Sequence, residues 1–187
     1  RILGPAPLVV LHHLLRGRGY HPDRLDAMLK AINQRHIGAR FSGEGAEVFV
    51  DRDALVLSTR APMQVERIIQ EADVPLHGTP LDIQACAVDT IQVLAGPEVA
   101  WLDREQVFFP LLLRPWRRGD RMRPAGLGGS KLISDLLIDA KVPSHRKPGV
   151  HVLLQGDRII WLCGLRLAEG VKATATSGRV LRLTWLG

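Results

Sequence analysis

The segment 112–143 constrains the fold of this chain more than any other part of the sequence. It begins with five arginines within ten residues, after which three glycines interrupt the chain. Apolar residues then recur at helical spacing from Leu132 to Ala140, Lys141 suits the last turn, and Pro143 ends the pattern. Ser130 stands at the position expected for the helix N-cap. The segment therefore predicts a basic loop joined directly to a short amphipathic helix.

The basic loop has the composition of a surface that faces phosphates. Guanidinium groups form paired hydrogen bonds with phosphate oxygens, and an indole ring can stack on a base. Gly119-Asp120 indicates a tight turn that aims the side chains, and Asp120, which would repel RNA, is expected to orient a neighbouring arginine. The other interpretation is a solvated arginine-rich turn. Trp116 among the arginines favours a binding surface.

Positive charge is concentrated in the same half of the chain. Residues 1–111 carry 11 Lys/Arg and 14 Asp/Glu, a net charge of −3, whereas residues 112–187 carry 14 and 5, a net charge of +9. A strongly basic region favours a polyanionic partner. We therefore expect the second half of the chain to bind the partner.

The cysteines and the apolar runs favour a cytoplasmic protein. Cys86 and Cys163 lie in apolar runs without CxxC spacing, so both are expected to be buried free thiols. No apolar run approaches the roughly 18 residues of a membrane-spanning helix, and no signal peptide is recognisable. We expect a soluble, unexported protein without a membrane partner.

Periodicity predicts an α+β fold, namely a small helical region with a β-hairpin, followed by a mostly β C-terminal domain that carries one amphipathic helix. Helices are expected over residues 5–15 and 22–35, and a hairpin over 47–57. Residues 65–72 fit either a helix or a strand. Further strands are expected at 81–87, 91–93, 99–101, 108–113, 150–154, 158–167 and 179–185.

Two motifs in the second half resemble a known family, the C-terminal domain of bacterial tRNA(Ile)-lysidine synthetase. They are Arg114-x-Trp116-x-x-Gly119-Asp120-Arg121-x-x-Pro124 and Leu132-x-Ser134-Asp135-Leu136-Leu137-Ile138-Asp139-Ala140-Lys141-Val142-Pro143. The similarity continues through Ile160-Trp161 and Gly164-x-Arg166 and covers about residues 98–184. Residues 1–60 match more loosely, through Gly19-Tyr20 and Gly38-x-Arg40-Phe41, where Arg40 replaces a usual lysine.

The resemblance implies a domain division and a function. It implies a helical substrate-recognition region over residues 1–60, a β-rich connector over 61–110 and a C-terminal tRNA-binding domain over 111–187. Enzymes of this family use ATP with Mg to ligate lysine to the wobble cytidine of tRNA(Ile), and their C-terminal domain contacts the acceptor end. Lys147 stands where arginine is common, and His151 where proline is common. When the tRNA-binding role of the family is carried over to the matching positions of this sequence, the resemblance implies these RNA-binding residues: Arg114, Trp116, Arg117, Arg118, Arg121, Arg123, Lys131 and Lys147.

No catalytic residue, metal site or cofactor is expected in this chain. The phosphate-binding loop of the family's ATP site is missing, and Gly126-x-Gly128-Gly129-Ser130-Lys131 has the wrong order for one. That segment is expected to bind a backbone phosphate of tRNA instead. The adjacent histidines His12 and His13 lack the spacing of metal ligands, and Asp135 and Asp139 look like helix-surface charges.

Two functional hypotheses therefore remain. The first is the tRNA-binding portion of the synthetase, which binds tRNA(Ile) and depends on a missing N-terminal catalytic domain for the chemistry of ATP and lysine. The second is a generic RNA-binding or ribosome-associated β-rich interaction module. The sequence leaves open whether the chain forms a homodimer.

Overall fold

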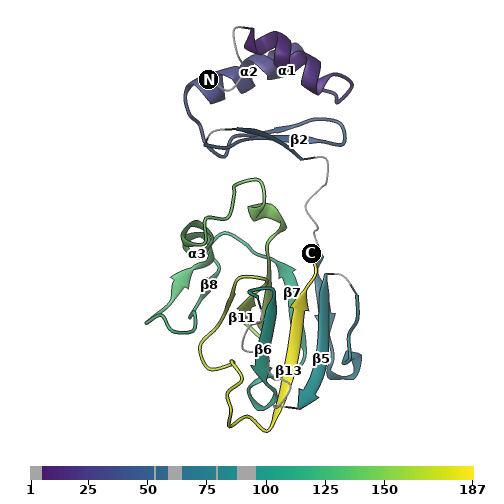
Figure 1. Ribbon diagram of the computed structural model, residues 1–187, viewed down its shortest axis with the longest axis vertical. Coiled ribbons are helices and arrows are strands. Elements are labelled where there is room, and N and C mark those ends of the chain that lie inside the picture. Colours follow the sequence, from purple (N-terminus) through teal and green to yellow (C-terminus); the bar gives the residue numbers. More distant parts are fainter. Residues whose placement is uncertain (1–5, 53, 59–64, 79, 88–95) are drawn as a thin grey trace. The chain divides into compact units, whose positions relative to one another are not determined.

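The computed structural model describes residues 6–52, 54–58, 65–78, 80–87 and 96–187 (Figure 1). The chain forms two compact units. Unit 1 comprises residues 1–62 and 142–148, and unit 2 comprises residues 63–141 and 149–187. The few helices and several antiparallel sheets confirm the predicted α+β, mostly β fold class.

Unit 1 consists of two helices and a small antiparallel sheet. Each helix begins at a proline, which suits the first turn because its missing N–H has no intrahelical role there. Buried apolar residues of both helices and of the middle strand form one core, and the Tyr20 hydroxyl donates to the carbonyl of Ala46 at 2.9 Å. The elements are α1 (Pro7–Leu15), α2 (Pro22–Asn33), β1 (Arg40–Ser42), β2 (Glu47–Val50) and β3 (Leu55–Ser58).

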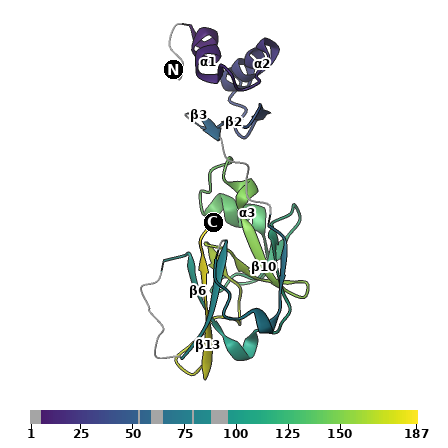
Figure 2. The same cartoon turned by 90° about the vertical axis from the view of Figure 1, so that its right-hand side faces the viewer.

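Unit 2 contains two larger antiparallel sheets, which form two layers in the paired views of Figures 1 and 2. The five-stranded sheet has the order β12-β11-β10-β7-β4, and the three-stranded sheet has the order β5-β13-β6. The strands of the first sheet are β4 (Arg67–Ile69), β7 (Leu111–Pro115), β10 (His151–Gln155), β11 (Arg158–Leu162) and β12 (Arg166–Leu167). Those of the second are β5 (Leu81–Ala87), β6 (Val99–Asp103) and β13 (Arg179–Trp185).

Most strand predictions were confirmed, but three ranges differ. The strand expected over 108–113 is β7 (Leu111–Pro115), and residues 108–110 lie outside it. Of residues 65–72, which fitted a helix or a strand, Arg67–Ile69 form β4, and the short 3-10 helix η1 (Glu71–Asp73) follows. The range 158–167 is two strands, because the chain turns at Gly164 with φ of +72° and the N–H of Leu165 donates to the carbonyl of Leu162. Residues 91–93 lie outside the described residues.

The amphipathic helix is α3 (Ile133–Asp139), which buries Ile133, Leu136 and Leu137 as its periodicity predicts. The predicted N-cap at Ser130 was wrong. Lys131–Leu132 form strand β9, which pairs with β8 (Arg121–Met122), so the backbone stays extended through Leu132 and the helix begins one residue later. Two further 3-10 helices are η3 (Arg104–Gln106) and η4 (Lys147–Gly149).

Both cysteines are free, as predicted. Cys163 is buried, but Cys86 is only partly buried, because it lies near the end of β5, where alternate side chains are exposed. His151 is fully buried in β10, with its ring centroid 5.2 Å from that of Trp185. Burial lowers the pKa of His151, although hydrogen bonds to the backbone of Gly149 and Val65 oppose this shift.

Candidate nucleic-acid interface

The basic loop connects two strands whose positions are fixed by the core of unit 2. β7 buries Leu111 and Leu113, and β8 buries Met122. Between these strands the chain turns back at Gly119, which has φ of +94°, a backbone conformation that glycine adopts without strain. The N–H of Asp120 donates to the carbonyl of Arg117 at 3.0 Å, which closes the turn.

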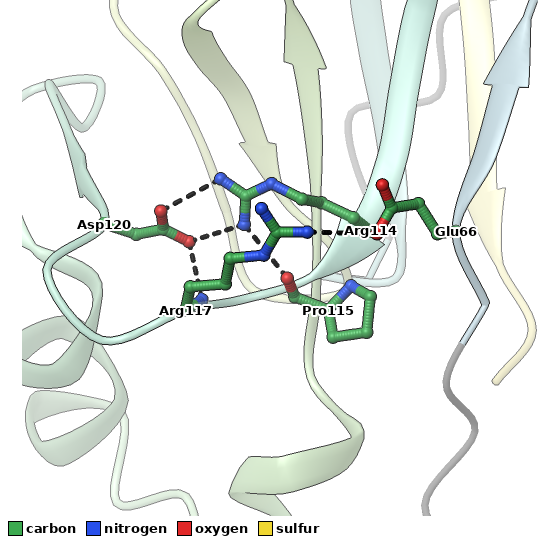
Figure 3. A network of polar contacts seen from close by, with 5 residues as sticks. All are labelled: Glu66, Arg114, Pro115, Arg117 and Asp120. Carbon is green, nitrogen blue, oxygen red and sulfur yellow. Dashed lines mark hydrogen bonds and ion pairs between the residues drawn. The ribbon is translucent and has the colours of Figure 1, made fainter.

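A carboxylate inside the turn holds the loop together (Figure 3). The Asp120 carboxylate oxygens accept hydrogen bonds from both terminal guanidinium nitrogens of Arg114, at 2.8 and 2.9 Å. They also accept one from the backbone N–H of Arg117 at 2.7 Å. The Arg114 and Asp120 side chains are only 9% and 13% exposed. This confirms that Asp120 orients a neighbouring arginine. Arg114, one of the predicted RNA-binding residues, is therefore buried within the loop.

The surroundings of Asp120 favour its charged form. Burial alone would raise the pKa of this carboxyl. Hydrogen bonds from the Arg114 side chain and the Arg117 backbone N–H, together with the charges of both arginines, have the opposite effect. They outweigh burial and hold the pKa of Asp120 below its usual value. A carboxyl with a lowered folded-state pKa stabilises the fold above its unfolded pKa of about 4 and loses that contribution as the pH falls through the folded value.

Asp120→Ala should destabilise unit 2 by about 3 kcal/mol at pH 7, because it leaves the Arg114 charge buried without its partner. Urea denaturation of the parent and the variant would measure the difference in unfolding free energy. The difference should shrink as the pH falls from about 4 through the lowered folded-state pKa of Asp120, because protonation of the parent carboxyl removes the charge that pairs with Arg114. Equal stabilities at pH 7 would show that the Arg114–Asp120 pair does not hold the fold.

The other arginines of the loop are exposed. A guanidinium nitrogen of Arg117 donates to Glu66 at 3.0 Å, and Arg121 contacts the Ser130 hydroxyl at 3.3 Å and the Ser130 carbonyl at 3.2 Å. Arg118 and Arg123 are exposed as well. The surface of the loop therefore presents guanidinium groups to solvent from a fixed backbone.

The remaining predicted residues have different surroundings. Trp116 is half-buried, and its backbone N–H donates to the carbonyl of Val150 at 3.1 Å. The side-chain nitrogen Nζ of Lys131 in β9 lies 3.4 Å from a carboxylate oxygen of Asp139 in α3. Lys147 is half-buried and belongs to the segment 142–148 of unit 1, whereas the rest of the set belongs to unit 2.

Comparison with known proteins identifies the domain that carries this loop. Residues 111–185 match the family model of the TilS substrate C-terminal domain. The tRNA(Ile)-lysidine synthase of Geobacter sulfurreducens is 44% identical over 78 residues, which are 42% of this chain and 17% of the relative. That of Parabacteroides distasonis is 27% identical over 186 residues, which are 98% of this chain and 42% of the relative.

A solved structure agrees with the sequence comparisons. The crystal structure of a TilS C-terminal domain matches with a TM-score of 0.51 and 27% sequence identity, over 57% of this chain and 82% of that chain. Residues 111–185 therefore form a C-terminal domain of the tRNA(Ile)-lysidine synthase family. The whole chain spans less than half the length of the two synthases described above. The match to the C-terminal domain of the synthase family includes the whole basic loop and α3.

Sequence reasoning missed one residue of the interface, Glu66. It lies 51 positions from Arg117, and neither residue has a motif that points to the other. The contact depends on the pairing of β4 with β7, in which Arg67 faces Leu113. A signal for this strand existed in the apolar residues Ile68 and Ile69, but it could not specify the register.

Within the residues that the structure describes, no group of three or more His, Cys, Asp or Glu side chains could hold a metal ion. Asp139 pairs with Lys131, and Asp135 contacts the Ser134 hydroxyl at 3.4 Å. In the same part of the chain, no helix combines the length and the apolar character needed to cross a membrane.

Proposed function

We propose that this chain is the tRNA-binding C-terminal part of a tRNA(Ile)-lysidine synthase. The observation that carries the proposal is the basic loop, in which a buried Arg114–Asp120 pair supports a turn with exposed arginines in the domain that matches the family. A held turn with exposed guanidinium groups suits a phosphate backbone, because the main chain that carries the side chains needs little ordering when RNA binds.

Each residue of the predicted set has a proposed role. Arg114 acts through Asp120, because its guanidinium is buried in the turn. Half-buried Trp116 is proposed to pack against RNA bases or sugars. Lys131 and Lys147 are proposed to contribute further phosphate contacts. The direct phosphate contacts of the loop fall to the exposed side chains of Arg117, Arg118, Arg121 and Arg123.

We propose that the reaction with ATP and lysine takes place in a part of the synthase outside this chain. The chain spans 42% of the Parabacteroides distasonis synthase that it matches almost throughout. We propose that ATP with Mg, and lysine, bind to an N-terminal catalytic part, and that this chain contacts the acceptor end of tRNA(Ile). On this proposal the chain needs no cofactor for binding.

The 187-residue chain should bind a tRNA(Ile) transcript but release no pyrophosphate from ATP. A dissociation constant of about 10 μM or tighter is expected near 50 mM salt, because basic surfaces bind nucleic acids nonspecifically in about that range. Fluorescence anisotropy would measure binding, and a pyrophosphate assay with tRNA and lysine present would measure turnover.

Unstructured RNA of equal length and composition is the control for this experiment. A tRNA-binding part of the synthase should prefer folded tRNA, whereas a generic RNA-binding module should bind both RNAs equally. Equal binding would therefore favour the second hypothesis. Pyrophosphate release by a sample free of contaminants would contradict the non-catalytic role.

A further inference from the structure

Glu66 stands beside the basic loop, and neither the motifs nor the family match assigns it a role. It directly precedes β4, the edge strand of the five-stranded sheet, and its carboxylate accepts a 3.0 Å hydrogen bond from Arg117 (Figure 3). Because Arg67 pairs with Leu113, the register places residue 66 beside the end of β7, where the loop begins. Strand pairing therefore fixes the backbone of Glu66 beside the start of the loop.

The two carboxylates at the loop differ in how firmly they are held. Asp120 accepts three hydrogen bonds and is almost buried. Glu66 accepts a single hydrogen bond from Arg117, and the side chains of Glu66 and Arg117 are 56% and 62% exposed. An exposed ion pair is screened by solvent and salt and contributes little to stability. Another anion can therefore replace Glu66 without disturbing the fold.

We propose that Glu66 is an autoinhibitory residue that occupies the phosphate position on Arg117 when RNA is absent. This inference rests on the proposed function, because it requires Arg117 to bind a phosphate. A carboxylate and a phosphate oxygen both accept hydrogen bonds from the guanidinium edge, so they compete for the same donors. Bound RNA displaces Glu66, and the displaced carboxylate stays near the phosphate and repels it.

The competition lowers the affinity of the loop for any phosphate backbone that uses Arg117. An RNA that contacts only Arg117 must displace Glu66 without the binding free energy that further phosphate contacts would supply. An RNA that also reaches Arg121 and Lys131 offsets the displacement with those contacts. Glu66 thus sets the minimum number of phosphate contacts that gives stable binding.

Glu66→Gln is the direct test, because it keeps the size of the side chain and removes its charge. Removing a unit negative charge a few ångströms from a bound phosphate should tighten binding by about three- to tenfold near 50 mM salt. The gain should decrease at 300 mM salt because the repulsion is screened. Fluorescence anisotropy with the 187-residue chain and a tRNA(Ile) transcript would measure it.

Glu71→Gln is the matched control. Glu71 is another exposed glutamate of unit 2, and it pairs with Arg104 instead of with the basic loop. This variant makes the same change in net charge, so a general electrostatic effect would tighten binding in both variants. We expect a change of less than about twofold for Glu71→Gln, since more distant exposed charges are largely screened.

Combining Glu66→Gln with Arg117→Ala separates the inference from the proposed function. Without Arg117 the glutamate has no guanidinium to occupy, so its replacement should alter affinity by less than about twofold. If Arg117→Ala alone leaves tRNA binding unchanged, the proposed role of Arg117 fails. If Arg117→Ala weakens binding but Glu66→Gln does not tighten it beyond Glu71→Gln, the autoinhibitory role of Glu66 is overturned and the proposed function stands.

Discussion

Leu137→Asp is expected to unfold unit 2. Leu137 is fully buried in α3, and an aspartate there would place an unpaired charge in an apolar environment. Such a change costs about 4 kcal/mol or more, a large share of the roughly 5–15 kcal/mol by which domains are stable. Leu136 is a less decisive position because it lines a cavity of about 120 Å³ together with Arg166, which could pair with a new carboxylate.

Ile138→Asp provides the matched control on the same helix. Ile138 is 60% exposed, so the same apolar-to-acidic change there should alter the unfolding free energy by less than about 0.5 kcal/mol. Thermal melts followed by circular dichroism would compare both variants with the parent. If Leu137→Asp melts at the parent temperature, α3 does not bury the face described here.

Local patterns in the sequence predicted most of the elements that build the interface. The helical recurrence of Ile133, Leu136 and Leu137 located α3, since the spacing of apolar residues reflects which face is buried. The lone acid among arginines also revealed its role, because a carboxylate there needs a cationic partner and Arg114 was available. Both inferences rest on residues close together in the sequence.

The features that escaped sequence analysis depend on contacts between distant segments. The true start of α3 follows from the pairing of β8 with β9, which local preference for a serine N-cap does not reveal. The ion pair between Glu66 and Arg117 depends on the β4–β7 register. Similarly, segment 142–148 follows α3 in the chain but belongs to unit 1, where the ring centroids of His145 and Phe49 lie 6.1 Å apart.

Burial divides the residues of the basic loop into a supporting group and an exposed group. The supporting group, Arg114 and Asp120, should affect binding only by changing the shape of the loop, and its loss should also lower stability. The exposed group should affect binding without changing stability. Parallel measurements of melting and binding for each variant can therefore assign a residue to one of the two groups.

The combined variant Arg117→Ala Arg118→Ala should bind tRNA more weakly and with a smaller salt dependence. Each neutralised phosphate releases condensed counterions, which contributes about 0.7 to 0.9 to the slope of log K against log salt. With about four to six contacts, the parent slope should be about −3 to −5. Losing two contacts should reduce its magnitude by about one to two units and weaken binding roughly 10- to 100-fold at 0.1 M salt.

The combined variant should also lower affinity for all tRNAs by a similar factor, because phosphate contacts carry no sequence information. Trp116→Ala is the comparison that removes no charge. It should weaken binding by about 1–3 kcal/mol if the ring stacks on a base, with the salt slope almost unchanged. A fall in melting temperature for Trp116→Ala would instead indicate that the ring supports the fold. If the arginine variant keeps both the affinity and the salt slope of the parent, the basic loop is not the surface that binds RNA, because no phosphate contact was lost with the two charges.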